Sequence, residues 1–190
     1  TLGWPEKTMA LRTYYPTQVM ETAHDIIFFW VARMMMFGEW LMRKEPFKVV
    51  YLSGLIRDPY GKKMSKTKGN VIDPLEVMDE IGADALRFAL VNGSAPGADL
   101  RLTSSRLDGA RNFANKIWNA ARFVLGARPE ELPDDVALTL PESDRLGPAE
   151  HWILSRCYVA LRDADAAYAN YQFAEATRIL HGAIWSEYCD

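Results

Sequence analysis

A basic segment in the first half of the chain carries the residues best suited to phosphate chemistry. Gly61 to Asn70 reads GKKMSKTKGN, which places four lysines, one serine and one threonine between two glycines, without a carboxylate. Lone ammonium groups are costly to bury, and the glycines disfavour a regular helix or strand. The segment is therefore predicted to be a mobile, cationic loop that can receive an anion. On charge alone, the alternative is a solvated, lysine-rich surface turn.

The segments on either side place this loop between a strand and a helix. Phe47 to Leu52 is a continuous apolar run with β-branched residues, which is typical of a buried parallel strand. After the loop, Asp73 is predicted to be the N-cap of a helix whose first residue is Pro74 and which ends at Gly82. A basic loop between a strand and a helix is a natural place for a phosphate.

The rest of the first half completes an α/β pattern. Gln18 to Thr22 alternates weakly and predicts a short strand. Asp25 to Arg43 is apolar on nearly all sides, which predicts a buried helix. A further short helix is predicted from Asp84 to Val91. The order strand, helix, strand, loop, helix is half of a doubly wound unit.

The second half has helical periodicity only. Apolar spacing predicts a helix from Ser105 to Leu125, capped by Ser105 with Asp108 and ended by Gly126. Two more helices are predicted at roughly 149–168 and 171–190. The predicted fold is thus α/β: the C-terminal half of a doubly wound, Rossmann-like domain over residues 1–100, then an α-helical bundle over 101–190. An acidic, proline-rich connector is predicted at about 127–148.

Charge is sorted along the chain. The net charge of −3 over 190 residues excludes a uniformly basic nucleic-acid coat, so a polyanion would have to meet local patches. Residues 57–68 and 105–128 are basic, and residues 129–150 are acidic.

The cysteine and hydropathy patterns indicate in which cellular compartment the protein is expected. Cys157 and Cys189 have no CxxC spacing and no histidine partner, so we expect reduced thiols in a cytoplasmic protein and no metal site built by the chain. The one membrane-like run, Ile26 to Met42, contains Arg33 and Glu39 and is shorter than the ~20 apolar residues of a membrane span. No membrane partner is expected.

The order of residues in the basic loop points to a family. Lys63-Met64-Ser65-Lys66-Thr67 resembles the KMSKS signature of class I aminoacyl-tRNA synthetases. The similarity runs from Thr1 to Asp190 and is greatest to the valine-specific members. The other matching segments are Tyr14 to Thr17, Asp25 to Met34, Val50 to Asp58, Gly69 to Pro74, Gly82 to Phe88 and Ala110 to Asn119.

This resemblance implies a role for each loop residue. In these enzymes an amino-acid carboxylate attacks the α-phosphate of ATP and pyrophosphate leaves, so negative charge builds on the leaving group. Lys63 and Lys66 would stabilise that charge as catalytic residues, Lys66 foremost. Ser65 and the backbone around Met64 would help to bind ATP. Thr67, which replaces the final serine of the signature, keeps a hydroxyl.

The resemblance also assigns residues outside the loop. Asp25 would accept the hydroxyls of the nucleotide ribose, or it would be the N-cap of the buried helix. Gly54 would allow close backbone approach to the nucleotide, although Ser53 stands before it where the family usually has histidine. Ile26 and Trp30, four residues apart on one helical face, would line the amino-acid pocket. Ordinary core packing is the alternative for this pair.

The helical half resembles the start of an anticodon-binding domain. Arg111, Lys116 and Arg122 would contact the tRNA backbone, with a solvated basic face as the alternative. The resemblance implies an enzyme that activates valine with ATP and Mg²⁺ and transfers it to tRNA(Val). This chain would be an internal part of that longer enzyme. The chain alone is expected to be inactive. The alternatives are an isoleucine-specific member or a non-catalytic, RNA-binding paralogue.

Overall fold

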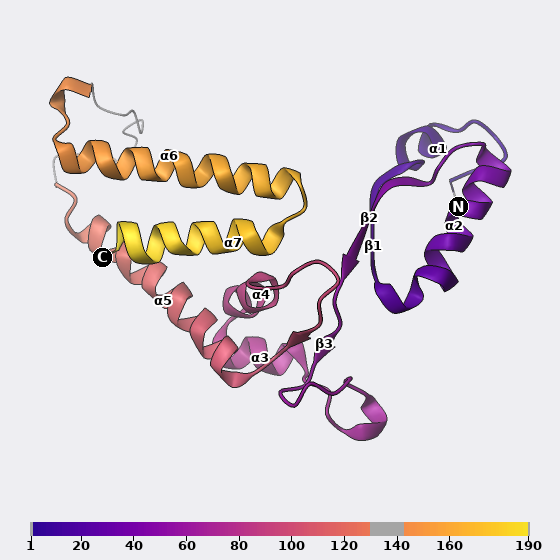
Figure 1. The fold of residues 1–190 in the computed structure, drawn as a ribbon, viewed down its shortest axis with the longest axis horizontal. Coiled ribbons are helices and arrows are strands. Elements are labelled where there is room, and N and C mark those ends of the chain that lie inside the picture. Colours follow the sequence, from indigo (N-terminus) through magenta and orange to yellow (C-terminus); the bar gives the residue numbers. More distant parts are fainter. Residues whose placement is uncertain (1, 130–142, 190) are drawn as a thin grey trace. The chain divides into compact units, whose positions relative to one another are not determined.

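The chain divides into two compact units. The computed structural model describes residues 2–129 and 143–189 (Figure 1). The first unit consists of residues 1–56 and 95–100, and the second of residues 57–94 and 101–190. Most of the predicted acidic connector, residues 130–142, lies outside the described residues. No described helix is long and apolar enough to cross a membrane.

A parallel pair of strands is the frame of the first unit. Helix α1 (Met9–Tyr14) begins at Thr8, whose hydroxyl accepts the N–H of Leu11 at 3.1 Å. Strand β1 (Thr17–Ala23) then pairs with β2 (Phe47–Ser53) in parallel, in a register that runs from Thr17 opposite Phe47 to Ala23 opposite Ser53. The two predicted strands and their parallel direction are confirmed.

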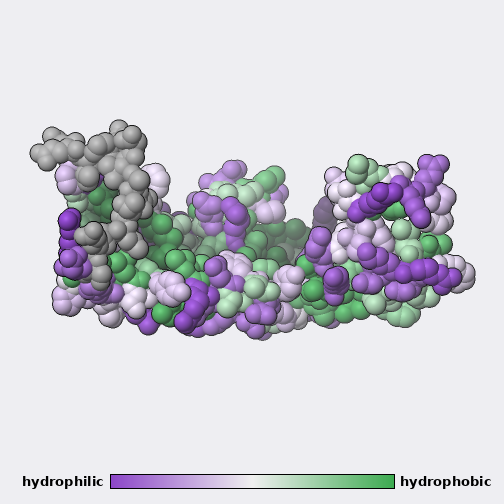
Figure 2. Space-filling model, turned by 90° about the horizontal axis from the view of Figure 1, so that it is seen from above, coloured by the Kyte–Doolittle hydropathy of each residue, from purple (hydrophilic) through white to green (hydrophobic). Residues whose placement is uncertain are grey.

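The helical connection between β1 and β2 is irregular. It consists of a 3₁₀ turn (His24–Ile26), a π-helical turn (Ile27–Val31), helix α2 (Ala32–Phe37) and a second π-helical turn (Gly38–Met42). Its predicted burial is wrong: Phe28 is 77% exposed and Trp40 75% exposed. A helix that is apolar on every side is buried only where neighbouring elements cover every side. The described residues of this unit do not cover all sides of this segment. Figure 2 shows hydrophobic residues, in green, at its right-hand end, which is the end where α2 is labelled in Figure 1.

Two short strands lie where the chain passes between the units. Strand β3 (Ile56–Arg57) and strand β4 (Leu100–Arg101) form a second sheet. The N–H of Leu102 donates to the carbonyl of Arg57 at 3.0 Å.

Helices form most of the second unit. Helix α3 (Pro74–Ile81) begins as predicted, because the Asp73 carboxylate accepts the N–H of Leu75 at 2.8 Å. Helix α3 ends at Gly82, whose φ of 91° favours glycine, and α4 (Ala83–Val91) follows.

The long helix α5 (Ser104–Gly126) differs from the prediction at both caps. Its N-cap is Thr103, whose hydroxyl accepts the N–H of Arg106 at 3.3 Å, and not Ser105. Gly126 is the last helical residue and Ala127 is the C-cap. Serine and threonine are both good N-caps, so the sequence alone does not select between neighbouring hydroxyl residues. Thr103 has the extended backbone of an N-cap, whereas Ser105 is already helical.

Aromatic side chains connect α4 and α5 to the C-terminal helices. Helix α6 (Pro148–Ala169) packs on α7 (Phe173–Gly182), and a π-helical turn (Ala183–Tyr188) follows α7. Phe113 of α5 is 5% exposed, and its ring centroid lies 4.8 Å from that of Phe88 and 4.4 Å from that of His181. His181 in turn stacks on Trp185 at 5.6 Å. We call Phe88, Phe113, His181 and Trp185 the aromatic cluster.

Candidate phosphate-binding loop and associated sites

The basic loop begins with a tight hairpin. The N–H of Gly61 donates to the carbonyl of Asp58 at 2.9 Å, which closes a turn with Pro59 in its second position. Gly61 has a φ of 81°, the left-handed conformation that such a hairpin requires of its last turn residue. Beyond the turn, Lys63 pairs with Arg57 in an antiparallel bridge.

A carboxylate and an amide hold the loop together. The Asp58 side chain, in a residue only 5% exposed, accepts the N–H groups of Tyr60 at 3.0 Å and Lys62 at 2.7 Å with one oxygen. Its other oxygen accepts the Asn70 amide at 2.9 Å. Asn70 also accepts the N–H of Ser65 at 2.9 Å and donates to the carbonyl of Lys63 at 3.3 Å. We call this arrangement the Asp58–Asn70 clasp.

The clasp keeps Asp58 ionised. The hydrogen bond from Asn70, followed by those from the N–H groups of Lys62 and Tyr60, lowers the pKa of Asp58 below its ordinary value of 3.8. These bonds outweigh burial, which acts in the opposite direction. The loop is therefore folded around a carboxylate that stays charged at neutral pH.

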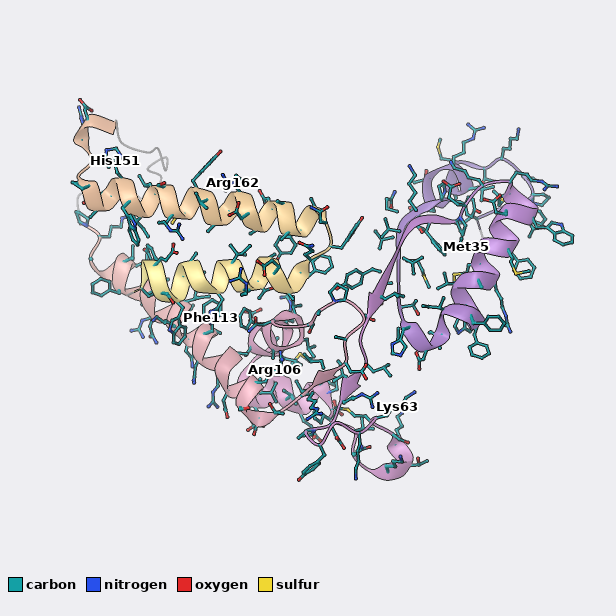
Figure 3. The ribbon with its side chains drawn as sticks, in the orientation of Figure 1. Met35, Lys63, Arg106, Phe113, His151 and Arg162 are labelled. Carbon is teal, nitrogen blue, oxygen red and sulfur yellow. The ribbon has the colours of Figure 1, made fainter. Side chains whose placement is uncertain are left out.

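The side chains of the loop lysines take no part in the Asp58–Asn70 clasp. Lys66 begins a short 3₁₀ turn (Lys66–Lys68), and Gly69 ends it with a φ of 65°. Lys66 is exposed, and its ammonium makes no ion pair with residues 2–129 or 143–189. Figure 3 marks Lys63 in the same loop. The hydroxyls of Ser65 and Thr67 bond to each other at 2.7 Å. The predicted exposure of the lysines is confirmed, whereas their mobility stays a prediction.

The other nucleotide and amino-acid candidates belong to the first unit. Asp25 lies within the 3₁₀ turn that begins after Ala23, and no side chain caps that turn. The alternative prediction that Asp25 is the N-cap of the helix is therefore wrong. Ile26 is 37% exposed and Trp30 is 53% exposed. They lie in a 3₁₀ and a π-helical turn, so the four-residue spacing does not have its α-helical meaning here.

The carboxyl ends of β1 and β2 bring several of these residues to one edge. Ala23 and Ser53 are register partners, so Asp25 and Gly54 both follow the same end of the pair. Open α/β sheets bind ligands at this end of their strands. A Cβ on Gly54 would lie 1.7 Å from the carbonyl oxygen of Ala98, so chain packing within the unit already requires glycine there.

Sequence reasoning missed Glu21 at this edge. The hydroxyl of Ser53 donates to the Glu21 carboxylate. Glu21 is exposed and stands two residues before the end of β1. The parallel register of β1 and β2 brings these two residues together. This register depends on how the strands pair, and no local motif in the sequence indicates it.

The three cationic candidates of α5 have different environments. Arg111 forms an exposed ion pair with Asp108 at 3.0 Å. Lys116 is half-buried: its ammonium donates to the carbonyl of Trp185 at 3.3 Å and lies 4.2 Å from the centre of the Trp185 ring. Arg122 is exposed and has no ion pair among the described residues. Lys116 thus has a packing role, whereas Arg122 is available to a partner.

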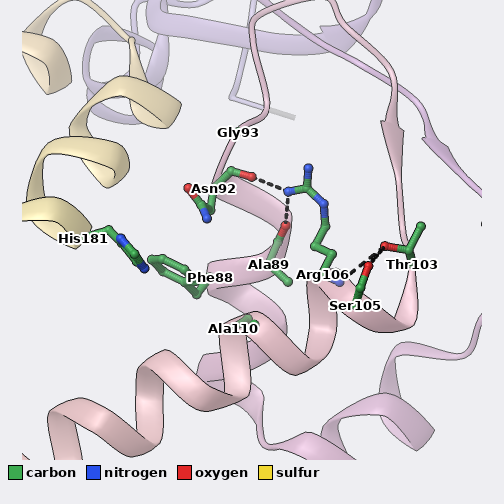
Figure 4. Close-up of a pocket in the computed structure, with 10 residues that line it drawn as sticks. Phe88, Ala89, Asn92, Gly93, Thr103, Ser105, Arg106, Ala110 and His181 are labelled. Carbon is green, nitrogen blue, oxygen red and sulfur yellow. Dashed lines mark hydrogen bonds between the residues drawn. The ribbon is translucent and has the colours of Figure 1, made fainter. Parts of the chain in front are cut away.

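A pocket of about 470 Å³ lies beside the start of α5 (Figure 4). Arg106 reaches across it and donates to the carbonyls of Ala89, at 3.1 Å, and Asn92. This guanidinium therefore satisfies carbonyls at the end of α4. His181 lines the pocket, and burial followed by the nearby Lys116 lowers its pKa from the ordinary 6.5.

Comparison with known proteins defines the family. The profile described as tRNA synthetases class I (I, L, M and V) matches residues 1–103, and the chain belongs to this family. Over its whole length it is 53% identical to a protein named "Valine--tRNA ligase" from Dehalococcoides mccartyi and 46% identical to one of the same name from Clostridium acetobutylicum. The chain spans only 21% of each of these relatives. The predicted resemblance is confirmed.

Solved structures share the fold. Mycobacterium tuberculosis methionyl-tRNA synthetase in complex with methionyl-adenylate matches with a TM-score of 0.78 and 22% identity, over 96% of this chain and 35% of that one. The Agrobacterium radiobacter LeuRS–tRNA–LeuAMS ternary complex matches with a TM-score of 0.73 and 21% identity, over 88% of this chain and 22% of that one. The predicted α/β class is confirmed.

Proposed function

We propose that this chain is an internal part of a valine--tRNA ligase, which joins valine to ATP as valyl-adenylate and passes the valyl group to tRNA(Val). The observation that carries the proposal is the match of the entire chain, at 46–53% identity, to proteins of that name. In this proposal residues 1–100 are the C-terminal half of the catalytic domain, and residues 101–190 begin an α-helical anticodon-binding domain. A cytoplasmic location fits the substrates.

The exposed loop lysines would act on the leaving pyrophosphate. Lys63 and Lys66 would stabilise charge that grows as the bond to the α-phosphate breaks, which favours the transition state over bound ATP. Lysine suits this task as a point charge on a flexible stem. Ser65 and the backbone of Met64 would bind the phosphates alongside them.

The residues at the carboxyl end of β1 and β2 would bind the other reactants. Asp25 would accept ribose hydroxyls, and the backbone of Gly54, which packs against the carbonyl of Ala98, would lie close to the nucleotide. Ile26 and Trp30 would bind the valine side chain. An apolar pocket of this kind separates amino acids that differ by one methylene by only about 10–200-fold, so the pocket alone gives limited fidelity.

The described residues do not fit a magnesium site of their own. They contain no group of three or more His, Cys, Asp or Glu side chains that could hold a metal ion. Mg²⁺ would accompany ATP as its phosphate complex, which is common for this ion.

Arg111 and Arg122 would position tRNA through its phosphates. Both are exposed on α5, and such contacts orient a nucleic acid without reading its bases. Lys116, held against Trp185, would contribute mainly by fixing the helix.

An amino-acid panel tests the proposal. In the full-length protein, ATP–pyrophosphate exchange should depend on valine and be much weaker with isoleucine. Stronger exchange with isoleucine would reassign the substrate. Absence of exchange with every amino acid would contradict an enzymatic role and favour an RNA-binding paralogue. The 190-residue chain alone should show no exchange.

A further inference from the structure

We propose that Asp58 and Asn70 are positioning residues for adenylate formation: the clasp sets the backbone from which Lys63 and Lys66 reach the phosphates. This inference rests on the proposed function of the loop. Neither side chain needs to touch the substrate, because each acts through the loop lysines.

The first step is that Asp58 is buried and Asn70 is half-buried, whereas the loop lysines are exposed. Asp58 is 5% exposed and uses both oxygens to accept N–H groups. A buried carboxylate with such partners is costly to disrupt, because removing one leaves the others desolvated and unsatisfied. Lys66 in the same loop is exposed. The carboxylate thus shapes the loop without placing its own charge at the tip.

The second step is that Asn70 holds the backbone on both sides of Met64. It accepts the N–H of Ser65 at 2.9 Å and donates to the carbonyl of Lys63 at 3.3 Å. Lys66 follows Ser65 directly and begins the 3₁₀ turn. One amide therefore fixes the chain at both catalytic lysines, and Asp58 fixes that amide. Preorganisation of this kind contributes to rate because reacting groups must be held within a fraction of an ångström.

The third step is that donor and acceptor chemistry permits only one orientation of the Asn70 amide. Its oxygen must face the N–H of Ser65, and its NH₂ must face the Asp58 carboxylate. A flipped amide would oppose donor to donor and acceptor to acceptor. An acid and an amide are thus both required, but exchanging them between the two positions keeps the central hydrogen bond.

The exchange provides the experiment. Single-turnover formation of valyl-adenylate is measured in the full-length enzyme and in Asp58→Asn, Asn70→Asp and the double variant Asp58→Asn/Asn70→Asp. Asp58→Asn opposes two amide NH₂ groups, and Asn70→Asp opposes two carboxylates. Each single change should lower the rate constant by about 100-fold, the order of effect of a 1 Å misplacement. The KM for ATP should change less than kcat.

The double variant should recover at least about tenfold of that loss, one hydrogen bond's share. In it the new amide at position 58 donates to the new carboxylate at position 70, which still accepts the N–H of Ser65. The carboxylate no longer donates to the carbonyl of Lys63, so the recovery is partial. The amplitude of the turnover reports the folded fraction, whereas the rate constant reports positioning. A purely structural role would lower amplitude and melting temperature but leave the rate constant unchanged.

Two further variants separate the possible failures. Asp73→Asn removes another carboxylate that accepts a backbone N–H, outside the clasp, and should leave the rate constant at the wild-type value. Lys66→Ala tests the loop itself. A slow Lys66→Ala with normal single clasp variants would overturn this inference alone, and a normal Lys66→Ala would overturn the proposed role of the loop lysines. If a single variant does not fold, a folded double variant that is still about 100-fold slower than wild type also overturns the inference.

Discussion

The two units differ in how far their described residues complete a candidate site. In the second unit, the basic loop is held by the Asp58–Asn70 clasp, and the aromatic cluster joins α4 and α5 to the C-terminal helices. In the first unit, Trp30 is 53% exposed and Phe28 is 77% exposed along an irregular helical segment. The candidate phosphate-binding loop is therefore shaped by local contacts, whereas the candidate amino-acid residues Ile26 and Trp30 are left partly uncovered by the described residues.

Aromatic truncation in each unit gives the largest contrast. Phe113→Ala in the second unit should lower the free energy of unfolding by about 3–5 kcal/mol, because a buried ring leaves a cavity. Trp30→Ala in the first unit should cost less stability and should raise the KM for valine. Chemical denaturation and amino-acid kinetics of the full-length protein measure both. Equal losses of stability would contradict the comparison.

A methyl group at Gly54 should have the next largest effect. Gly54→Ala would push a Cβ toward the carbonyl oxygen of Ala98, only 1.7 Å away, and backbone would have to move. We expect a loss of about 1–3 kcal/mol, typical of overpacking. Gly69→Ala is the control for space, since nothing lies within 4 Å of its Cβ, although its φ of 65° adds a small strain cost. A Gly54→Ala protein as stable as wild type would refute the close approach.

Acidification should weaken the aromatic cluster before it affects the clasp. Burial lowers the pKa of His181 from 6.5, so the unfolded chain binds a proton that the folded chain resists. Stability is therefore full above about pH 6.5 and falls as the pH drops below it. The pKa of Asp58 is also lowered, so its contribution is lost only below its ordinary 3.8. Melting temperatures of wild type and His181→Gln between pH 7.5 and 5 check this, and parallel curves would contradict it.

The smallest expected effect concerns tRNA. Arg122→Ala and Arg111→Ala should each weaken binding uniformly and reduce the slope of log affinity against log salt by about 0.7–0.9, the share of one phosphate contact. Filter binding at several salt concentrations measures this. Unchanged slopes for both variants would assign the residues to a solvated face.

Local signals in the sequence predicted much of the fold. The β-branched run gave β2, and Asp73, Pro74 and Gly82 gave both ends of α3, because these residues act on their own backbone. The exposure of the 24–42 segment was not predictable, since burial depends on what covers a surface.

Contacts between distant residues were also beyond the sequence. Asp58 and Asn70 are twelve residues apart, and neither belongs to a motif that requires the other. Arg106 satisfies carbonyls of α4 across a turn, seventeen residues from Ala89. The exposure of the loop lysines, in contrast, was predictable from the cost of burying charge. Their catalytic role rests on the resemblance of Lys63 to Thr67 to the KMSKS signature and stays a prediction.

In the proposed function, the position of a lysine in the loop, and not the total charge, determines adenylate formation. Lys66 and Lys68 are both exposed and lie in the same 3₁₀ turn, so they form a matched pair. Single-turnover formation of valyl-adenylate by the full-length enzyme separates the effect of position from that of charge. Lys66→Ala should slow it by about 10²–10³-fold, as for other lost transition-state donors, while Lys68→Ala stays close to wild type. Equal effects of the two substitutions would show that the loop is only a solvated cluster of cations.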